Sequence, residues 1–80
     1  MNSHFEQVVW HAQNAGFQVE TLAGDNCSFR VYPDDGSRWA TVTVGHSGLV
    51  RWNTPGAEFR QFDSPSVAFK ELKKAWGTNL

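Results

Sequence analysis

Hydrophobic and polar positions change their spacing twice along the chain, and the first stretch has the spacing of a helix. Near the N-terminus, hydrophobic residues recur three or four positions apart, as on one helix face. The members of this stripe are Phe5, Val8, Val9 and Ala12. Ser3 and Glu6 fit the S-x-x-E capping box that begins a helix, and Gly16 suits the left-handed position that ends one. The pattern predicts a helix over about residues 4–15.

From residue 17 to residue 62, hydrophobic and polar residues alternate every second position, which is typical of strands with one buried face. Groups rich in Gly, Pro, Asp and Asn interrupt this alternation and have the residue types of turns. The expected strands cover residues 17–22, 27–32, 39–44 and 49–53. Residues 57–62 are either a fifth strand or an extended lead-in to the next helix. Short strands joined by short turns predict an antiparallel meander.

A second helical pattern closes the chain. Ser64 and Pro65 supply an N-cap and a proline at the first helical position, where its missing N–H costs nothing. The hydrophobic stripe of this helix is Ala68, Phe69, Leu72, Ala75 and Trp76. Positive charge near its C-terminal end suits the helix dipole. These cations are Lys70, Lys73 and Lys74.

These patterns together predict one two-layer α+β domain over residues 1–80, in the order α-β-β-β-β(-β)-α. Both helices are expected on one face of an antiparallel sheet of four or five strands. A chain of 80 residues is too short for two cores, and its four Trp, one Tyr and six Phe enlarge the area that one core buries. The aromatic content and the net charge of -1 exclude a disordered chain and a generally basic, nucleic-acid-coating protein.

The sequence has no apolar run of transmembrane length and no charged-then-apolar leader. We therefore expect a cytoplasmic protein that neither spans a membrane nor is secreted.

Residues able to carry chemistry are few and poorly spaced for it. His4 and His11 are seven positions apart, whereas two metal ligands on one helix need a spacing of three or four, and His46 has no ligand pattern around it. The single Cys27 excludes an internal disulfide and shares the parity of Phe29, as a small buried hydrophobe would. No phosphate-binding glycine loop is present. We predict no metal, no cofactor and no enzymatic activity.

The outer face of the predicted sheet is the more informative feature. If the hydrophobic positions face the helices, the alternate positions point away from them, and Arg51 or Trp52 joins these depending on register. Arg, Tyr and Trp are the residue types enriched in binding surfaces, because they combine contact area with polar groups. We predict that a protein partner docks on Arg30, Tyr32, Trp39, Arg51 and Trp52.

Two alternatives to this surface stay open. Cross-strand aromatic and Thr pairs stabilise an outer face without any partner, and aromatic rings also stack on nucleic-acid bases. Across the predicted sheet, acidic residues outnumber arginines, the reverse of a phosphate-binding surface. The lysine cluster of the last helix, Lys70, Lys73 and Lys74, is the candidate nucleic-acid surface of this alternative.

Part of the chain resembles a known family. The motifs are residues 14–17, Gly24, the run Phe-Arg-Val-Tyr-Pro-Asp-Asp-Gly at 29–36, and the alternating Thr and Val of 41–44. Over about residues 8–47 they resemble HicA-type toxins, RNA-cleaving proteins with a double-stranded-RNA-binding-like fold. Those toxins place a catalytic histidine after a Gly-Ser pair, where this sequence reads Gly-Asp-Asn-Cys at 24–27. The resemblance therefore supports the fold and argues against the cleavage activity. The alternative function that it implies is an RNA-binding protein or an RNA-cleaving toxin of a toxin–antitoxin pair, and the cleaving form would need His11 or His46 in place of the missing histidine.

In type, the chain also resembles small phage-encoded inhibitors such as anti-CRISPR proteins. These are small single domains, near-neutral or acidic, that carry no catalytic motif and block a host protein machine. This resemblance implies an inhibitor of a host defence complex, acting in the host cytoplasm. An exposed edge strand of the sheet also predicts self-association, because unpaired backbone groups invite strand addition.

Overall fold

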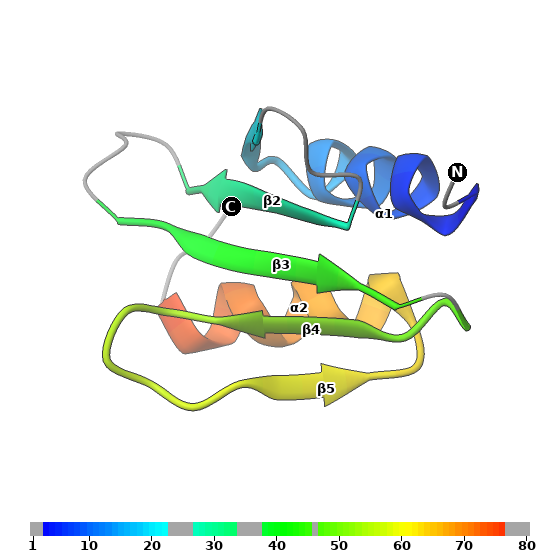
Figure 1. Ribbon diagram of the computed structural model, residues 1–80. Helices are drawn as coiled ribbons and strands as arrows, with labels where there is room; N and C mark the ends of the chain where they lie inside the picture. Colours follow the sequence, from blue (N-terminus) through cyan, green and yellow to red (C-terminus); the bar gives the residue numbers. More distant parts are fainter. Residues whose placement is uncertain (1–2, 23–26, 34–37, 46, 77–80) are drawn as a thin grey trace.

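The computed structural model describes residues 3–22, 27–33, 38–45 and 47–76 (Figure 1). Its elements are α1 (Ser3–Asn14), β1 (Gln18–Thr21), β2 (Ser28–Tyr32), β3 (Ala40–Val44), β4 (Val50–Asn53), β5 (Arg60–Phe62) and α2 (Pro65–Trp76). This order confirms the predicted α+β fold and shows that the fifth strand exists. It is three residues long, so the first half of the predicted 57–62 segment is a connection.

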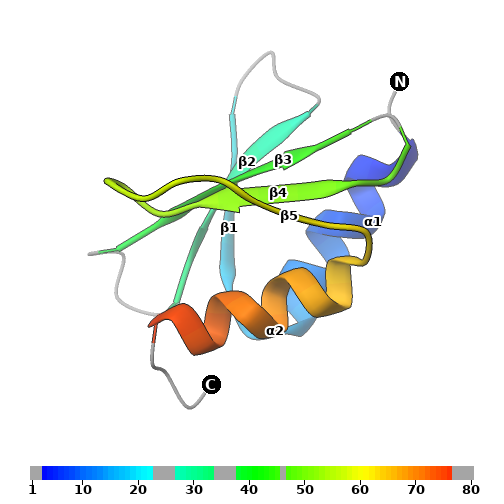
Figure 2. The ribbon, with the colours of Figure 1, turned by 90° about the horizontal axis from the view of Figure 1, so that it is seen from below.

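The five strands form one antiparallel meander in chain order, β1-β2-β3-β4-β5. Both helices lie on the same face of this sheet, as Figure 2 shows from below. The core fills the space between the two layers and draws on every helix and on the middle strands. Its buried hydrophobic side chains are Val8, Ala12, Phe17, Phe29, Val31, Ala40, Val42, Val44, Val50, Trp52, Ala68, Phe69 and Leu72.

Gly16 terminates α1. Its φ of 98° is the left-handed conformation predicted for it. The Gly16 N–H donates to the Gln13 carbonyl oxygen at 3.1 Å, and the Phe17 N–H donates to that of Ala12 at 3.2 Å. These two bonds are those of a Schellman motif, in which the flanking hydrophobic residues also pack together. Phe17 thereby enters the core directly after the helix.

A cluster of rings and charges fixes the edge strand β5 to α2. Trp52 and Phe62 stack at 5.8 Å between ring centroids. The Arg60 guanidinium carbon lies 5.4 Å from the Trp52 ring centroid and 5.2 Å from that of Phe62. Arg60 also pairs with Glu71 of α2 at 3.4 Å. Cation–π and ionic contacts therefore supplement the short backbone ladder of this strand.

One residue of the predicted helix stripes does not face the core. Ala75, in the last turn of α2, is exposed, whereas Trp76 next to it packs against the core.

Several predictions concern residues that the structure does not describe. The side chain of Ser3, on which the capping box depends, lies outside the described residues. So do the turn predicted at 23–26, the turn predicted at 33–36 except for Pro33, and His46.

Candidate functional site

The outer face of the sheet carries two rows of polar side chains that cross the strands. The first row runs through the cross-strand partners Glu20, Arg30, Thr41 and Asn53. The second row runs through Ser28, Thr43, Arg51 and Gln61. The opposite parity is buried in each central strand, so the register fixes these rows outward.

Trp39, directly before β3, is held by a chain of contacts on this face. Its exposed fraction is 36%, and the Arg30 guanidinium carbon lies 5.5 Å from its ring centroid. Arg30 Nη1 lies 3.9 Å from Glu20 Oε1, and the Tyr32 hydroxyl donates to that same oxygen at 2.8 Å. We call these four residues the Trp39 cluster. Because each member touches the next, the indole is oriented before any partner arrives.

The predicted site is partly brought together. Arg30, Tyr32 and Trp39 are neighbours in the Trp39 cluster. Arg51 also faces outward, but it lies in the other row, where its Nε donates to Gln61 Oε1 at 2.9 Å. It is therefore on the same face without contacting Trp39 through any described interaction.

Trp52 was wrongly predicted to face outward. In β4 it is the cross-strand partner of buried Val42, and its exposed fraction is 3%. Its indole Nε1 donates to the Ala68 carbonyl oxygen at 2.8 Å. The sequence left the register of β4 open, and the structure places Val50 and Trp52 inward and Arg51 outward. Trp52 is therefore a core residue that no partner can reach in the folded protein.

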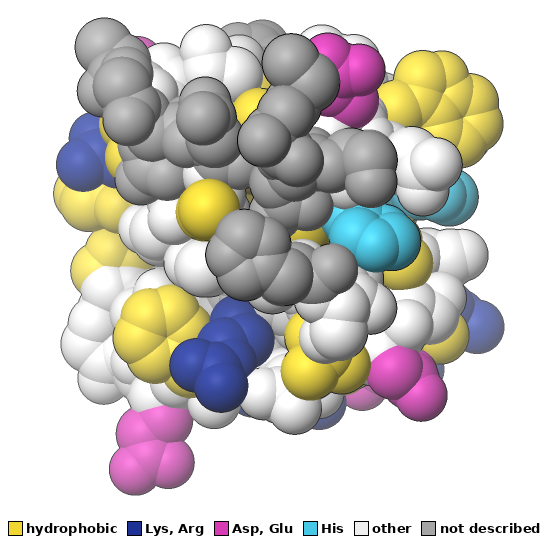
Figure 3. Space-filling model, turned by 45° about the vertical axis from the view of Figure 1, so that its right-hand side comes forward, with side chains coloured by type: hydrophobic (Ala, Val, Ile, Leu, Met, Phe, Trp, Pro, Cys, Tyr) yellow, Lys and Arg dark blue, Asp and Glu magenta, His cyan; other side chains and the backbone are white. Residues whose placement is uncertain are grey.

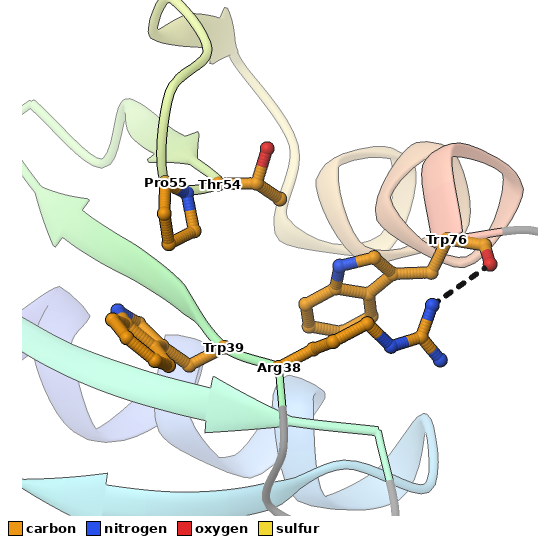
Figure 4. Close-up of a pocket in the computed structure, with 5 residues that line it drawn as sticks. All are labelled: Arg38, Trp39, Thr54, Pro55 and Trp76. Atoms are coloured by element: carbon orange, nitrogen blue, oxygen red, sulfur yellow. Dashed lines mark hydrogen bonds between the residues drawn. The ribbon is translucent and has the colours of Figure 1, made fainter.

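A pocket opens beside Trp39. It has a volume of about 360 Å³, and its lining residues are Arg38, Trp39, Thr54, Pro55 and Trp76. Figure 4 shows the two indoles on opposite sides, with Pro55 above and the Arg38 side chain running below toward Trp76. The volume is in the lower part of the range of ligand pockets, which is roughly 300–1,000 Å³.

Trp76 is a fixed wall of this pocket. Its ring meets the core ring of Phe17 edge-on, with 5.5 Å between the centroids. On the pocket side, Arg38 Nη1 donates to the Trp76 carbonyl oxygen at 3.3 Å, and the Arg38 guanidinium carbon lies 5.8 Å from the Trp76 ring centroid. Sequence patterning missed Trp76 as a site residue because its position in the helical stripe assigned it to the core.

Large hydrophobic side chains are exposed at four described positions, which are Trp10, Trp39, Phe59 and Val67. On the face shown in Figure 3, hydrophobic side chains lie in separate patches among polar and charged ones. Trp10, on α1, is 57% exposed and touches only the ring of its neighbour His11 among the described aromatic contacts. Trp10 also borders a hollow, of about 260 Å³, so what distinguishes Trp39 is the cation that holds its ring.

The three lysines of α2 do not form one cluster. Lys70 and Lys73 line a hollow of about 200 Å³ between the two helices, together with His11, Asn14 and other residues. Lys74 points elsewhere and pairs with Glu71 at 3.3 Å. The structure therefore brings two of the three predicted cations together and adds His11 to them.

Within the described residues, no group of three or more His, Cys, Asp or Glu side chains could hold a metal ion. Cys27 is half-buried directly before β2, on the parity predicted for it. Neither described helix has the length and hydropathy that crossing a membrane requires. Comparison with known proteins gives no match, whether with protein-family models, curated proteins or solved structures.

Proposed function

We propose that this protein is a non-enzymatic protein-binding module that acts by occupying a surface of a larger partner. The observation that carries the proposal is the Trp39 cluster: a partly exposed indole, oriented by Arg30 and bordering a pocket. Tryptophan and arginine dominate the energetics of protein interfaces. An indole that is already ordered loses little conformational entropy on binding, so more of its contact energy appears as affinity.

The most specific form of the proposal is a phage or mobile-element inhibitor of a host defence complex, of the anti-CRISPR type, acting in the host cytoplasm. Its support is the small size, the net charge of -1 and the aromatic-rich composition. Such an inhibitor needs only a surface that competes for a site on its target, and the Trp39 cluster is the surface that we assign to this task.

The experiment is an affinity capture from a host lysate, with and without nuclease, read by mass spectrometry. We expect a stoichiometric protein complex that survives nuclease treatment. Loss of all captured proteins after nuclease, with RNA recovered before it, would contradict the proposal.

A HicA-like RNA-binding function is the second candidate, favoured by the hollow that Lys70 and Lys73 share with His11. Cations that contact phosphates give binding that weakens steeply as salt is added. This candidate predicts salt-dependent RNA binding that Lys70→Ala and Lys73→Ala weaken. Lys74→Ala is the matched control, because Lys74 pairs with Glu71 outside the hollow. Equal losses for all three variants would assign the effect to net charge alone and remove the hollow as an RNA site.

We also propose that the protein self-associates through a sheet edge. β1 and β5 are the two edge strands, and β1 is mostly exposed. Unpaired backbone groups on such an edge accept a strand from a second copy. A solution mass measurement tests this: a species of twice 9.0 kDa is expected, and a monomer at all concentrations would contradict it.

A further inference from the structure

The pocket beside Trp39 is built by three parts of the chain that are distant in sequence. Residues 38 and 39 precede β3, residues 54 and 55 follow β4, and Trp76 ends α2. Two indoles and a proline ring supply apolar walls, and Thr54 also lines the pocket (Figure 4). Such walls select a flat apolar group, because aromatic pairs gain energy beyond the area they bury.

Arg38 determines which charge the pocket accepts. Its guanidinium is held in place by the carbonyl oxygen and the ring of Trp76, and it makes no ion pair with any described residue. Arginine has five N–H donors, and one described hydrogen bond leaves others for a ligand. An oriented guanidinium binds a carboxylate strongly. It repels a cationic ligand, so the aromatic walls do not make a cage for methylated lysine.

We propose, on the basis of the protein-binding function above, that this pocket receives an extended acidic segment of the partner protein. One aromatic side chain of that segment lies between Trp39 and Trp76, and a neighbouring carboxylate pairs with Arg38. A nucleic-acid strand fits less well, since it carries a charge at every nucleotide and needs a row of cations. Arg38 is the one cation among the described lining residues.

The test uses three short synthetic peptides labelled with fluorescein. The first has one phenylalanine flanked by glutamates, the second has lysines in place of the glutamates, and the third has alanine in place of the phenylalanine. Fluorescence anisotropy measures their binding to the full chain. We expect the first peptide to bind about 10-fold or more tighter than either of the others, because charge complementarity and the ring both contribute.

Variants then locate the binding. Arg38→Gln and Trp39→Ala are each expected to weaken binding of the glutamate peptide about 10-fold. Trp10→Ala is the control, because it removes an equally large and more exposed indole from α1. Thermal melting of each variant verifies that it is folded. Binding that survives Arg38→Gln in a folded protein would overturn the proposal.

Three further outcomes bear on the proposed ligand. Equal binding of the glutamate and lysine peptides, or no binding of the glutamate peptide, would overturn the acidic-segment assignment. Tighter binding of an oligouridylate, lost in Arg38→Gln, would replace the peptide by a nucleic-acid strand. The peptide result is separate from the capture result. If capture of a partner depends on Trp39 while the peptide fails, the protein-binding function stands and only its ligand chemistry is wrong.

Discussion

The indole Nε1 of Trp52 donates a hydrogen bond to the backbone carbonyl oxygen of Ala68 at 2.8 Å, inside the core. This bond joins β4 to α2, two elements that the chain connects through β5. It also separates two tryptophans that the sequence had placed on one surface. Trp52 stabilises the contact between the two layers, whereas Trp39 keeps an exposed indole on the outer face.

Replacing Trp52 by phenylalanine is expected to destabilise the protein by about 1–3 kcal/mol. The change removes the buried hydrogen bond and part of a ring that fills the core. Urea denaturation monitored by circular dichroism measures the free energy of unfolding. Trp10→Phe is the control, since an exposed position of this kind changes stability by about 0.5 kcal/mol at most. Equal stability of the two variants would contradict the core role of Trp52.

Gly48 and Gly56 provide a matched pair of backbone positions. Both have positive φ, 89° and 82°, so alanine at either position strains the backbone. A Cβ at Gly48 would also lie 3.3 Å from two ring atoms of His4, whereas a Cβ at Gly56 would meet nothing within 4 Å. We therefore expect Gly56→Ala to cost about 1 kcal/mol and Gly48→Ala to cost more.

The difference between the unfolding free energies of these two variants reports how closely His4 of α1 approaches Gly48, between β3 and β4. Adding His4→Ala to Gly48→Ala tests the cause, because it removes the ring that the new methyl group meets. His4→Ala alone is the reference, because it also loses the interactions that His4 makes in the wild type. Against this reference, we expect Gly48→Ala to cost no more than Gly56→Ala costs in the wild type. An excess cost that persists in the His4→Ala background would show that the ring is not the obstacle.

The carboxylate of Glu71 makes the stability of the protein depend on pH in the acidic range. Lys74, at 3.3 Å, and then Arg60, at 3.4 Å, lower the pKa of Glu71 below its ordinary value of 4.5. Because the folded protein has the lower pKa, the stabilisation is fully present above about pH 4.5 and is lost as the pH falls through the folded value.

The measurement is the free energy of unfolding of the wild type and of Glu71→Gln across this range of pH. We expect the wild type to be slightly more stable at neutral pH, by a small amount because these charges face water. The difference between the two proteins should shrink on acidification. A difference that stays constant down to about pH 3 would contradict the assigned pKa shift.

The order of elements could be predicted from the sequence because each element has a local signal. Gly16 ends α1 by the motif that its position suggested, and the alternation around Phe29 and Val42 fixed which parity of β2 and β3 is buried. In β4, the hydrophobic Val50 and Trp52 alternate with Arg51, yet Trp and Arg both occur at binding surfaces. Composition therefore left the register open, and packing against Ala68 decided it.

The candidate site could be predicted only in part, since it depends on contacts between distant segments. Arg30 and Tyr32 lie in β2 and Trp39 directly precedes the neighbouring β3, so period-two spacing places them on one face. The pocket needs Trp76, which lies 37 positions after Trp39 and has the spacing of a core residue. Only the docking of α2 on the sheet brings these two indoles to opposite walls.

The central claim is that Trp39 is the anchor by which this protein holds a partner. Capture of the partner by the wild type, Trp39→Ala and Trp10→Ala, each verified as folded by thermal melting, tests it most directly. Truncating a central aromatic anchor costs about 2–4 kcal/mol of binding, so Trp39→Ala should lose the partner while Trp10→Ala retains it. Retention by both variants, or loss by Trp10→Ala alone, would contradict the claim and move the interface away from the Trp39 cluster.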